Sequence, residues 1–248
     1  MVVQDQQWLI IHRLKIQQAY QNRGMPALFW SSHDQPRAVG RYCNLEYRYY
    51  AQTMLFMLLY LQKGHIFIYQ GEEFGMSGFG KVDITNYQDV EAINYYYKAI
   101  KEKPVDEVLT SLSIKARDHA RTPMQWNSTK YAGFSKATPW FQVNQNYKKV
   151  NFNKDYYSNQ SIYKFLKNLL SYKSTSKTLQ MGSFILKDLG EDIFSYERVL
   201  DKRYLVVCNF SDQKEPIGTI NGEIVLNNYQ DFDGALNPYQ AILFKINN

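Results

Sequence analysis

Two short apolar runs near the start of the chain constrain its fold more than any other feature. They are "ALFW" at 27–30 and "HIFIYQ" at 65–70, and both read as short buried strands. Each run follows a helical pattern, over 5–22 before the first and over about 44–63 before the second, which closes at Gly64 as a C′ residue. The order of helix, strand, helix and strand predicts a parallel α/β sheet.

The regular alternation stops at about residue 74. Residues 74–150 form a long connecting segment without strand patterns, in which helices are predicted at 88–102 and near 104–116. A clean amphipathic pattern then predicts a helix over 158–174, with Ser158 or Asn159 as its N-cap.

The last part of the sequence predicts a small antiparallel β-sandwich. Its apolar residues alternate in short runs that are separated by turn residues. The runs are "SFILKD", "IFSYERVL", "RYLVVCNF", "EIVLNN" and "QAILFKI". We therefore predict two domains, an α/β part over 1–175 and a β-sandwich over 176–248.

Charge and hydropathy argue against two classes of partner. The 29 basic and 23 acidic residues leave a net charge of +6, but they are scattered, without the basic stripe that binds nucleic acid. The longest apolar run, "MLFMLLYL", is far below the roughly 18 residues of a bilayer span, and no secretory signal is visible. We expect no nucleic-acid or membrane partner, and the isolated thiols of Cys43 and Cys208 fit a reducing cytoplasm.

No pattern in the sequence predicts a metal or a cofactor. The four histidines, at positions 12, 33, 65 and 119, lack ligand spacing, and the cysteines do not form a pair. The "GFGK" string at 78–81 is too short for a phosphate-binding loop and lacks the following Ser or Thr.

Polar clusters follow both predicted strands. His33 and Asp34 come after "ALFW", and residues 70–73, "QGEE", come after "HIFIY". In parallel α/β barrels the active site is built at these strand ends. A single His-Asp pair is more often a hydrogen-bonded loop pair, so the pair alone does not decide between catalysis and scaffold.

Five sequence motifs taken together are more informative about function than the His33-Asp34 pair alone. "ALFWSSHDQPRAV", "IYQGEEFGM", "KARDHARTPMQW", "GFSKATPW" and "LNPYQA" occur in this order over the chain. In this set, from about residue 5 to 248, the sequence resembles the exo-α-glucosidases of glycoside hydrolase family 13. That group includes oligo-1,6-glucosidase, dextran glucosidase and trehalose-6-phosphate hydrolase.

The resemblance implies a fold and a first pair of site residues. It implies that 1–175 is the C-terminal portion of a (β/α)8 barrel, with "ALFW" and "HIFIY" as about strands seven and eight. Asp34 matches the family's third catalytic carboxylate, which binds two hydroxyls of the glucosyl ring and stabilises the oxocarbenium-like transition state. His33 matches the histidine that helps hold the same ring.

Three more substrate contacts follow from the resemblance. At least one of Arg117 and Arg121 is expected to close the pocket at the terminal hydroxyls, and Arg121 is favoured because it precedes the Thr-Pro turn. Either arginine could instead be scaffold, paired with Glu72, Glu73 or Asp118. Glu91 matches a glutamate that contacts the next sugar, although by sequence alone it is equally a surface helix residue.

The chain differs from the family pattern at Ser32 and at His119, and it lacks two of the family's catalytic motifs. Ser32 stands where an asparagine usually precedes the His-Asp pair, which removes an amide beside Asp34, and His119 stands in place of another asparagine. The strings that carry the family's nucleophile and its general acid are absent. The resemblance therefore implies that six of the eight strands, and two of the three catalytic carboxylates, lie outside this sequence.

The resulting expectation is the C-terminal part of a retaining α-glucosidase, inactive as an isolated chain. The substrate would be a short oligosaccharide or trehalose 6-phosphate, and Trp30 tilts the choice toward the phosphorylated disaccharide. The alternative is a non-catalytic, truncated sugar-binding or structural module. In either case the unpaired edges of a partial barrel predict self-association.

Overall fold

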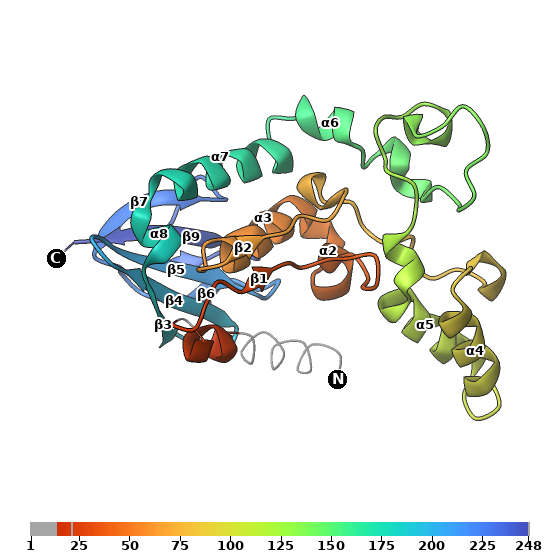
Figure 1. The fold of residues 1–248 in the computed structure, drawn as a ribbon, viewed down its shortest axis with the longest axis horizontal. Coiled ribbons are helices and arrows are strands. Elements are labelled where there is room, and N and C mark those ends of the chain that lie inside the picture. Colours follow the sequence, from red (N-terminus) through yellow and green to blue (C-terminus); the bar gives the residue numbers. More distant parts are fainter. Residues whose placement is uncertain (1–13, 21, 248) are drawn as a thin grey trace. The chain divides into compact units, whose positions relative to one another are not determined.

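The computed structural model describes residues 14–20 and 22–247, and the contacts within it divide the chain into two compact units (Figure 1). The sheet unit holds the described residues up to Phe29, Tyr42–Phe67, and the residues from Lys164 onward. The loop unit holds Trp30–Arg41 and Ile68–Tyr163. From the sequence we predict a domain boundary between residues 175 and 176, where helical patterns give way to strand patterns. The two units are defined by contacts instead, so that boundary stays a prediction.

Two short strands of the sheet unit pair in parallel, as predicted for "ALFW" and "HIFIYQ". β1 covers only Ala27–Leu28 and β2 only His65–Ile66, with Ala27 opposite His65. Both are shorter than predicted, because the chain passes into the loop unit after residues 29 and 67. Gly64 allows β2 to begin beside β1, since a Cβ at Gly64 would lie 2.5 Å from the Pro26 carbonyl oxygen.

Helix α3, Arg48–Tyr60, follows a 3₁₀ turn at Leu45–Tyr47 and is shorter than the predicted 44–63. Its C-cap is Leu61, so the prediction that Gly64 is its C′ residue was wrong. Every residue from Ala51 to Tyr60 is buried. A helix that is apolar on all sides is typical of the interior of a protein.

Two buried cations satisfy the C-terminal end of α3. Lys173 Nζ donates to the carbonyls of Tyr60 and Gln62 at 2.7 and 2.6 Å, and Arg198 Nη1 donates to that of Leu61 at 2.6 Å. These carbonyls have no partner within the helix and carry its negative dipole end. Burial lowers the pKa of Lys173 to about 7 and that of Arg198 to about 10.

Five strands of the sheet unit form an antiparallel sheet in the order β3-β4-β5-β9-β7 (Figure 1). Their bounds are Ser183–Asp188 for β3, Ile193–Val199 for β4, Arg203–Asn209 for β5, Gly222–Asn227 for β7 and Ala241–Ile246 for β9. Each coincides with one of the five alternating runs, so all five strand predictions are confirmed. β6, Glu215–Pro216, and β8, Ala235–Leu236, form a separate two-stranded sheet.

Alternation along the strands gives the five-stranded sheet two apolar faces. Leu205 of β5 and Ile242 of β9 share one apolar cluster with Leu236 of β8, so the small sheet covers that face. Helix α3 packs on β5 and β9, and the Tyr196 hydroxyl of β4 donates to the Met57 carbonyl at 3.2 Å. The predicted sandwich thus has one full layer and a minimal second layer.

Helices α4, Val90–Ala99, and α5, Val105–Lys115, form a hairpin in the loop unit (Figure 1). They confirm the helices predicted at 88–102 and 104–116, with shorter bounds. Pro104 is the N-cap of α5, where its missing N–H removes no helical hydrogen bond. Ala92 of α4 and Leu112 of α5 are 4% exposed and belong to the core of the hairpin.

The remaining elements are short. The α-helices are α2 Ala38–Tyr42, α6 Phe152–Tyr156 and α8 Lys177–Met181. The other 3₁₀ turns are Glu72–Phe74, Ile84–Asn86, Arg117–Ala120, Lys130–Gly133 and Gln145–Lys148.

Helix α7, Ile162–Thr175, begins later than the predicted 158–174. Neither Ser158 nor Asn159 is its N-cap. The buried Asp155 carboxylate accepts from the backbone N–H groups of Ile162 and Tyr163, both at 3.0 Å. The N-cap prediction was wrong because the carboxylate that satisfies these donors comes from the preceding helix, α6.

Three sequence predictions concern the first residues, the thiols and the membrane. Of the helix predicted over 5–22, residues 14–20 are helical, and Trp8 and Ile11 lie outside the described residues. Cys43 and Cys208 are free thiols, and burial raises the pKa of both. Within residues 14–20 and 22–247, no helix has the length and apolar character needed to cross a membrane.

Candidate active site

The His33-Asp34 pair lies in a tight turn of the loop unit. The Ser32 hydroxyl accepts from the backbone N–H of Asp34 at 3.2 Å, and the Ser32 carbonyl accepts from that of Gln35 at 3.3 Å. The first bond is the Ser/Thr version of an Asx turn, and the second is the backbone bond that closes a β-turn. Ser32 therefore lacks the amide of the family's asparagine but still fixes the backbone of Asp34.

Asp34 is held from two sides. His33 Nε2 lies 3.1 Å from Asp34 Oδ2, and Arg121 Nη2 donates to Asp34 Oδ1 at 3.0 Å. Arg121 Nε also donates to the His33 carbonyl at 3.0 Å, so one guanidinium binds the side chain and the backbone of the turn. The Asp34 side chain remains 52% exposed and that of His33 74%, which leaves both open to a ligand.

Arg117 approaches the same carboxylate from farther away and has stronger partners of its own. Its Nη1 lies 3.7 Å from Asp34 Oδ1, whereas its Nε and Nη2 donate to the two carboxylate oxygens of Asp89 at 2.9 and 2.8 Å. Its Nη2 also lies 3.1 Å from Glu91 Oε2. All five predicted site residues thus lie within one ion-pair cluster, which we define as His33, Asp34, Asp89, Glu91, Arg117 and Arg121.

Asp89 is the member of the cluster that the sequence did not reveal. It is 8% exposed, and its Oδ1 also lies 3.8 Å from Arg121 Nη1, so it faces both arginines. The hydrogen bond from Arg117 holds the pKa of the Asp89 carboxyl below its usual range and raises the pKa of Arg117. Asp89 stands at the N-cap of α4, a position where aspartate ordinarily predicts only a helix cap.

A second buried carboxylate fixes Asp89 in turn. Asp118 is 1% exposed, and its Oδ2 accepts from the backbone N–H groups of Gln88 and Asp89 at 2.8 and 2.9 Å. Asp118 therefore holds the chain just before α4 in place, and its partners are backbone donors.

The scaffold pairings considered for the arginines were wrong. The carboxylate partners of Arg117 and Arg121 are Asp34, Asp89 and Glu91. The second polar cluster, residues 70–73, faces a different cation, Arg37.

Arg37 is buried among backbone carbonyls and glutamates. It is 2% exposed and donates to the carbonyls of Gln70 and Ala120 at 2.7 and 3.3 Å. Burial lowers its pKa to about 10, against the attraction of Tyr69, Glu73 and Glu72. Burial also raises the pKa of Glu73.

Two further sequence signals belong to the core of the loop unit. His119 is 1% exposed; its Nδ1 accepts from the backbone N–H of Phe79 at 3.2 Å, and its Nε2 donates to the Leu112 carbonyl at 3.0 Å. Gly78 makes room for this ring, because a Cβ there would lie 2.8 Å from Nδ1. Trp30, the residue that tilted the substrate choice, is 3% exposed and so is not available to a sugar.

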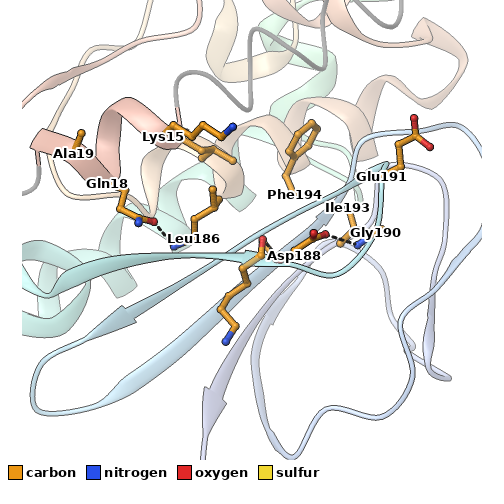
Figure 2. Close-up of a pocket in the computed structure, with 12 residues that line it drawn as sticks. Lys15, Gln18, Ala19, Leu186, Asp188, Gly190, Glu191, Ile193 and Phe194 are labelled. Atoms are coloured by element: carbon orange, nitrogen blue, oxygen red, sulfur yellow. Dashed lines mark hydrogen bonds between the residues drawn. The ribbon is translucent and has the colours of Figure 1, made fainter.

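Among the described residues, neither a metal centre nor the hollow beside the β3–β4 hairpin coincides with the ion-pair cluster. Across residues 14–20 and 22–247, no group of three or more His, Cys, Asp or Glu side chains is arranged to hold a metal ion. Figure 2 shows a hollow of about 920 Å³ in the sheet unit, lined by residues of 14–20 and of the β3–β4 hairpin. Gln18 Oε1 accepts from the Leu186 N–H at 2.9 Å there, and none of the predicted site residues lines it.

Comparison with known proteins assigns the family. The family model described as alpha amylase, catalytic domain, matches residues 3–182. The chain is 35% identical to an oligo-1,6-glucosidase of Bacillus cereus over 94% of its own length and 44% of that protein. It is 34% identical to a trehalose-6-phosphate hydrolase of Bacillus subtilis over 90% of its length and 43% of that protein.

A solved structure agrees. A trehalose-6-phosphate hydrolase of Bacillus licheniformis superposes with a TM-score of 0.87 at 32% identity, over 94% of this chain and 45% of that one. The chain thus spans less than half the length of these relatives. Because the family model covers most of its residues, the chain belongs to the alpha-amylase family of glycoside hydrolases.

Proposed function

We propose that this chain supplies the Asp34 side of the glucosyl-binding site of a retaining α-glucosidase that cleaves short oligosaccharides or trehalose 6-phosphate. The observation that carries the proposal is the Asp34 carboxylate, which is fixed by Arg121 and His33 yet remains half exposed. A carboxylate in this state has free lone pairs for hydroxyl donors and a set orientation.

The chemistry follows from how a glucosyl ring changes during cleavage. As the bond to the leaving group breaks, positive charge develops on the ring and its hydroxyls become stronger donors. Bonds from those hydroxyls to Asp34 strengthen at the transition state, and such differential binding accelerates the reaction. Arg121 holds the carboxylate and the backbone of the turn in place, in the manner of a preorganised site.

In this proposal, some of the other residues of the cluster contact the sugar directly and others position those that do. His33, whose ring is mostly exposed, donates to the same sugar. Arg121 contacts the terminal hydroxyls with its remaining donors. Arg117, bound to both oxygens of Asp89, orients Glu91 toward the next sugar unit and acts on substrate mainly through that residue.

The nucleophile and the general acid are proposed to come from outside this chain. A retaining enzyme places these two carboxyl groups about 5 Å apart across the bond that breaks. Asp89 is unsuited to either role, because it is nearly buried and both its oxygens accept from Arg117. Glu91 is paired with the same arginine. We infer that β1 and β2 are the last two strands of a (β/α)8 barrel, and that the isolated chain is inactive in the cytoplasm where we expect it.

The proposal is tested on the full-length protein, meaning the product of the complete reading frame to which this sequence belongs. Its hydrolysis of isomaltose and of trehalose 6-phosphate should be assayed in parallel with that of the 248-residue chain. Turnover of either sugar by the full-length protein, and of neither by the chain, is expected. Turnover by the purified chain that Asp34→Asn abolishes would refute the division of carboxylates, and no turnover by either would favour a non-catalytic sugar-binding module.

A further inference from the structure

We propose that Arg37 is a positioning residue, which holds the turn that carries Asp34 at a fixed separation from the backbone of Arg121. This inference rests on the proposed function and deepens it, because it names what keeps the glucosyl-binding carboxylate and its arginine together. Arg37 is 2% exposed, so its side chain acts on a sugar only through its neighbours. Its carbonyl accepts from the N–H of Arg41 at 3.1 Å, which places Arg37 at the start of α2.

The Asp34–Arg121 pair depends on support from elsewhere in the fold. The two residues are 87 positions apart in sequence, and their side chains meet at 3.0 Å. The side chain of Asp34 is 52% exposed and that of Arg121 is 27% exposed. Ion pairs with this much exposure are weak, because water screens the charges and ordering the two side chains costs entropy. The separation of the two segments must therefore be set by buried contacts.

On one side, Arg37 is coupled to Asp34 through a short and stiff piece of chain. Only two residues separate them, and the second is Pro36, whose ring fixes its own φ angle and restricts the residue before it. The Ser31 hydroxyl accepts from the backbone N–H of Ala38 at 3.1 Å, which closes the loop on both sides of Asp34. A shift of Arg37 is therefore passed on to the Asp34 turn.

On the other side, the Arg37 guanidinium binds the peptide bond that joins Ala120 to Arg121. Its Nη2 donates to the Ala120 carbonyl at 3.3 Å, and the Tyr69 hydroxyl donates to the same oxygen at 3.1 Å. Ala120 is fully buried, so these donors take the place of water at its carbonyl. Because the carbonyl carbon is bonded to the nitrogen of Arg121, the two donors fix where the Arg121 backbone begins.

The Arg37 guanidinium is itself fixed by its surroundings. Its Nη1 donates to the Gln70 carbonyl at 2.7 Å, and its central carbon lies 5.5 Å from the centre of the Tyr69 ring. Gly71 lets the group approach, because a Cβ there would lie 2.9 Å from Nη1. Two nitrogens of one planar group thus reach the carbonyls of two segments, whereas a lysine offers one nitrogen on a shorter side chain.

The test follows the side-chain Nε–H of Arg121 by NMR in the 248-residue chain. This group donates to the His33 carbonyl at 3.0 Å, so its exchange with water reports how the Arg121 side chain sits against the Asp34 turn. Arg37→Lys keeps the positive charge and should speed this exchange roughly tenfold, the scale of one hydrogen bond to a charged group. In the full-length protein the same change should lower kcat and leave KM for isomaltose nearly unchanged, because the Asp34 contact strengthens at the transition state.

Arg198→Lys is the matched control, since Arg198 is also a buried arginine that donates to backbone carbonyls, but in the sheet unit. It should lower the free energy of unfolding and leave both the Arg121 exchange and kcat as in the wild type. If Arg37→Lys does not fold, Tyr69→Phe decides, because it removes only the second donor to the Ala120 carbonyl. This change should speed the exchange roughly threefold, the scale of one neutral hydrogen bond.

Three results would overturn the inference and leave the proposed function standing. They are wild-type exchange at Arg121 in the folded variant, equal acceleration in Arg198→Lys, and an unchanged kcat in full-length Arg37→Lys. Accelerated exchange in Arg37→Lys but not in Arg198→Lys would support the inference. If the full-length wild-type protein then turned over neither isomaltose nor trehalose 6-phosphate, that result would count against the proposed function alone.

Discussion

At the level of single residues, the site depends on a carboxylate that touches no proposed substrate atom. Asp89 binds Arg117 through both oxygens and also faces Arg121, so it sets where the two guanidinium groups point. The sequence marked Asp34, His33, Arg117, Arg121 and Glu91 through their motifs, and the structure places them in one cluster. Asp89 was missed because its position before α4 already explains an aspartate.

Replacing Asp89 tests this dependence. Asp89→Asn should lower stability at neutral pH and flatten the loss of stability in acid. The folded-state pKa of Asp89 is lowered, so its contribution is present above the unfolded value of about 3.9 and is lost as pH falls through the folded value. Urea unfolding between neutral and acidic pH measures both effects. Equal pH dependence in the variant and the wild type would contradict the account.

His119 stands in place of the family's usual asparagine, and its ring is packed in the core of the loop unit. The Phe79 N–H points at Nδ1, so the fold requires an unprotonated Nδ1, and burial lowers the pKa of His119.

A stability profile near neutral pH checks this assignment. The folded pKa of His119 lies below the unfolded value of about 6.5, so the unfolded state takes up a proton first as pH falls below that value. The free energy of unfolding should therefore decrease from pH 7.5 to pH 5.5, and His119→Asn should reduce this decrease. An unchanged slope in His119→Asn would count against a neutral, buried ring.

At the level of elements, the hydrophobic pattern of a short segment predicted whether it forms a strand or a helix. The five alternating runs became the five strands of the sheet, because successive side chains of a strand point to opposite faces. β4, β5 and β9 bury most of their residues on both faces, whereas β3 and β7 do not. The ends of elements depended on distant partners and were less predictable. α3 ends where Lys173 and Arg198 bind its carbonyls, and these residues lie more than a hundred positions away in sequence.

The start of α7 offers the clearest test at this scale. Asp155→Ala removes a buried carboxylate from two backbone donors and from the Ser161 hydroxyl, and should cost about 2 kcal/mol. Asn159→Ala, at an exposed position, should change stability by less than about 0.5 kcal/mol. Urea denaturation followed by circular dichroism measures both values. A larger loss of stability in Asn159→Ala than in Asp155→Ala would instead support Asn159 as the N-cap of α7.

At the level of the whole molecule, the outer edges of β1 and β2 matter most, because no other strand among the described residues pairs with them. Among the described residues these strands pair only with each other, and Phe67 just after β2 is 58% exposed. Parallel strands are ordinarily buried on both faces and paired on both edges. The sequence predicted the parallel pairing, but the rest of the proposed barrel has no counterpart among these residues.

Self-association of the chain is the expected consequence. Sedimentation velocity should show mass increasing with concentration, and Phe67→Lys should reduce this increase by placing a charge beside the open edge. Tyr157→Lys, at a residue that is 77% exposed elsewhere in the chain, is the matched control and should behave as wild type. A monomer at all concentrations would show that the edges are already protected.

The central claim is that Asp34 acts on the transition state, and kinetics of Asp34→Ala and Asp34→Glu in the full-length protein test it most directly. Each change should lower kcat/KM by about 3 kcal/mol or more, the scale of one preorganised transition-state contact. The melting temperature should hardly change, because the Asp34–Arg121 pair is half exposed and such pairs contribute little to stability. Nearly normal turnover together with a lower melting temperature would make Asp34 a scaffold residue and contradict the account.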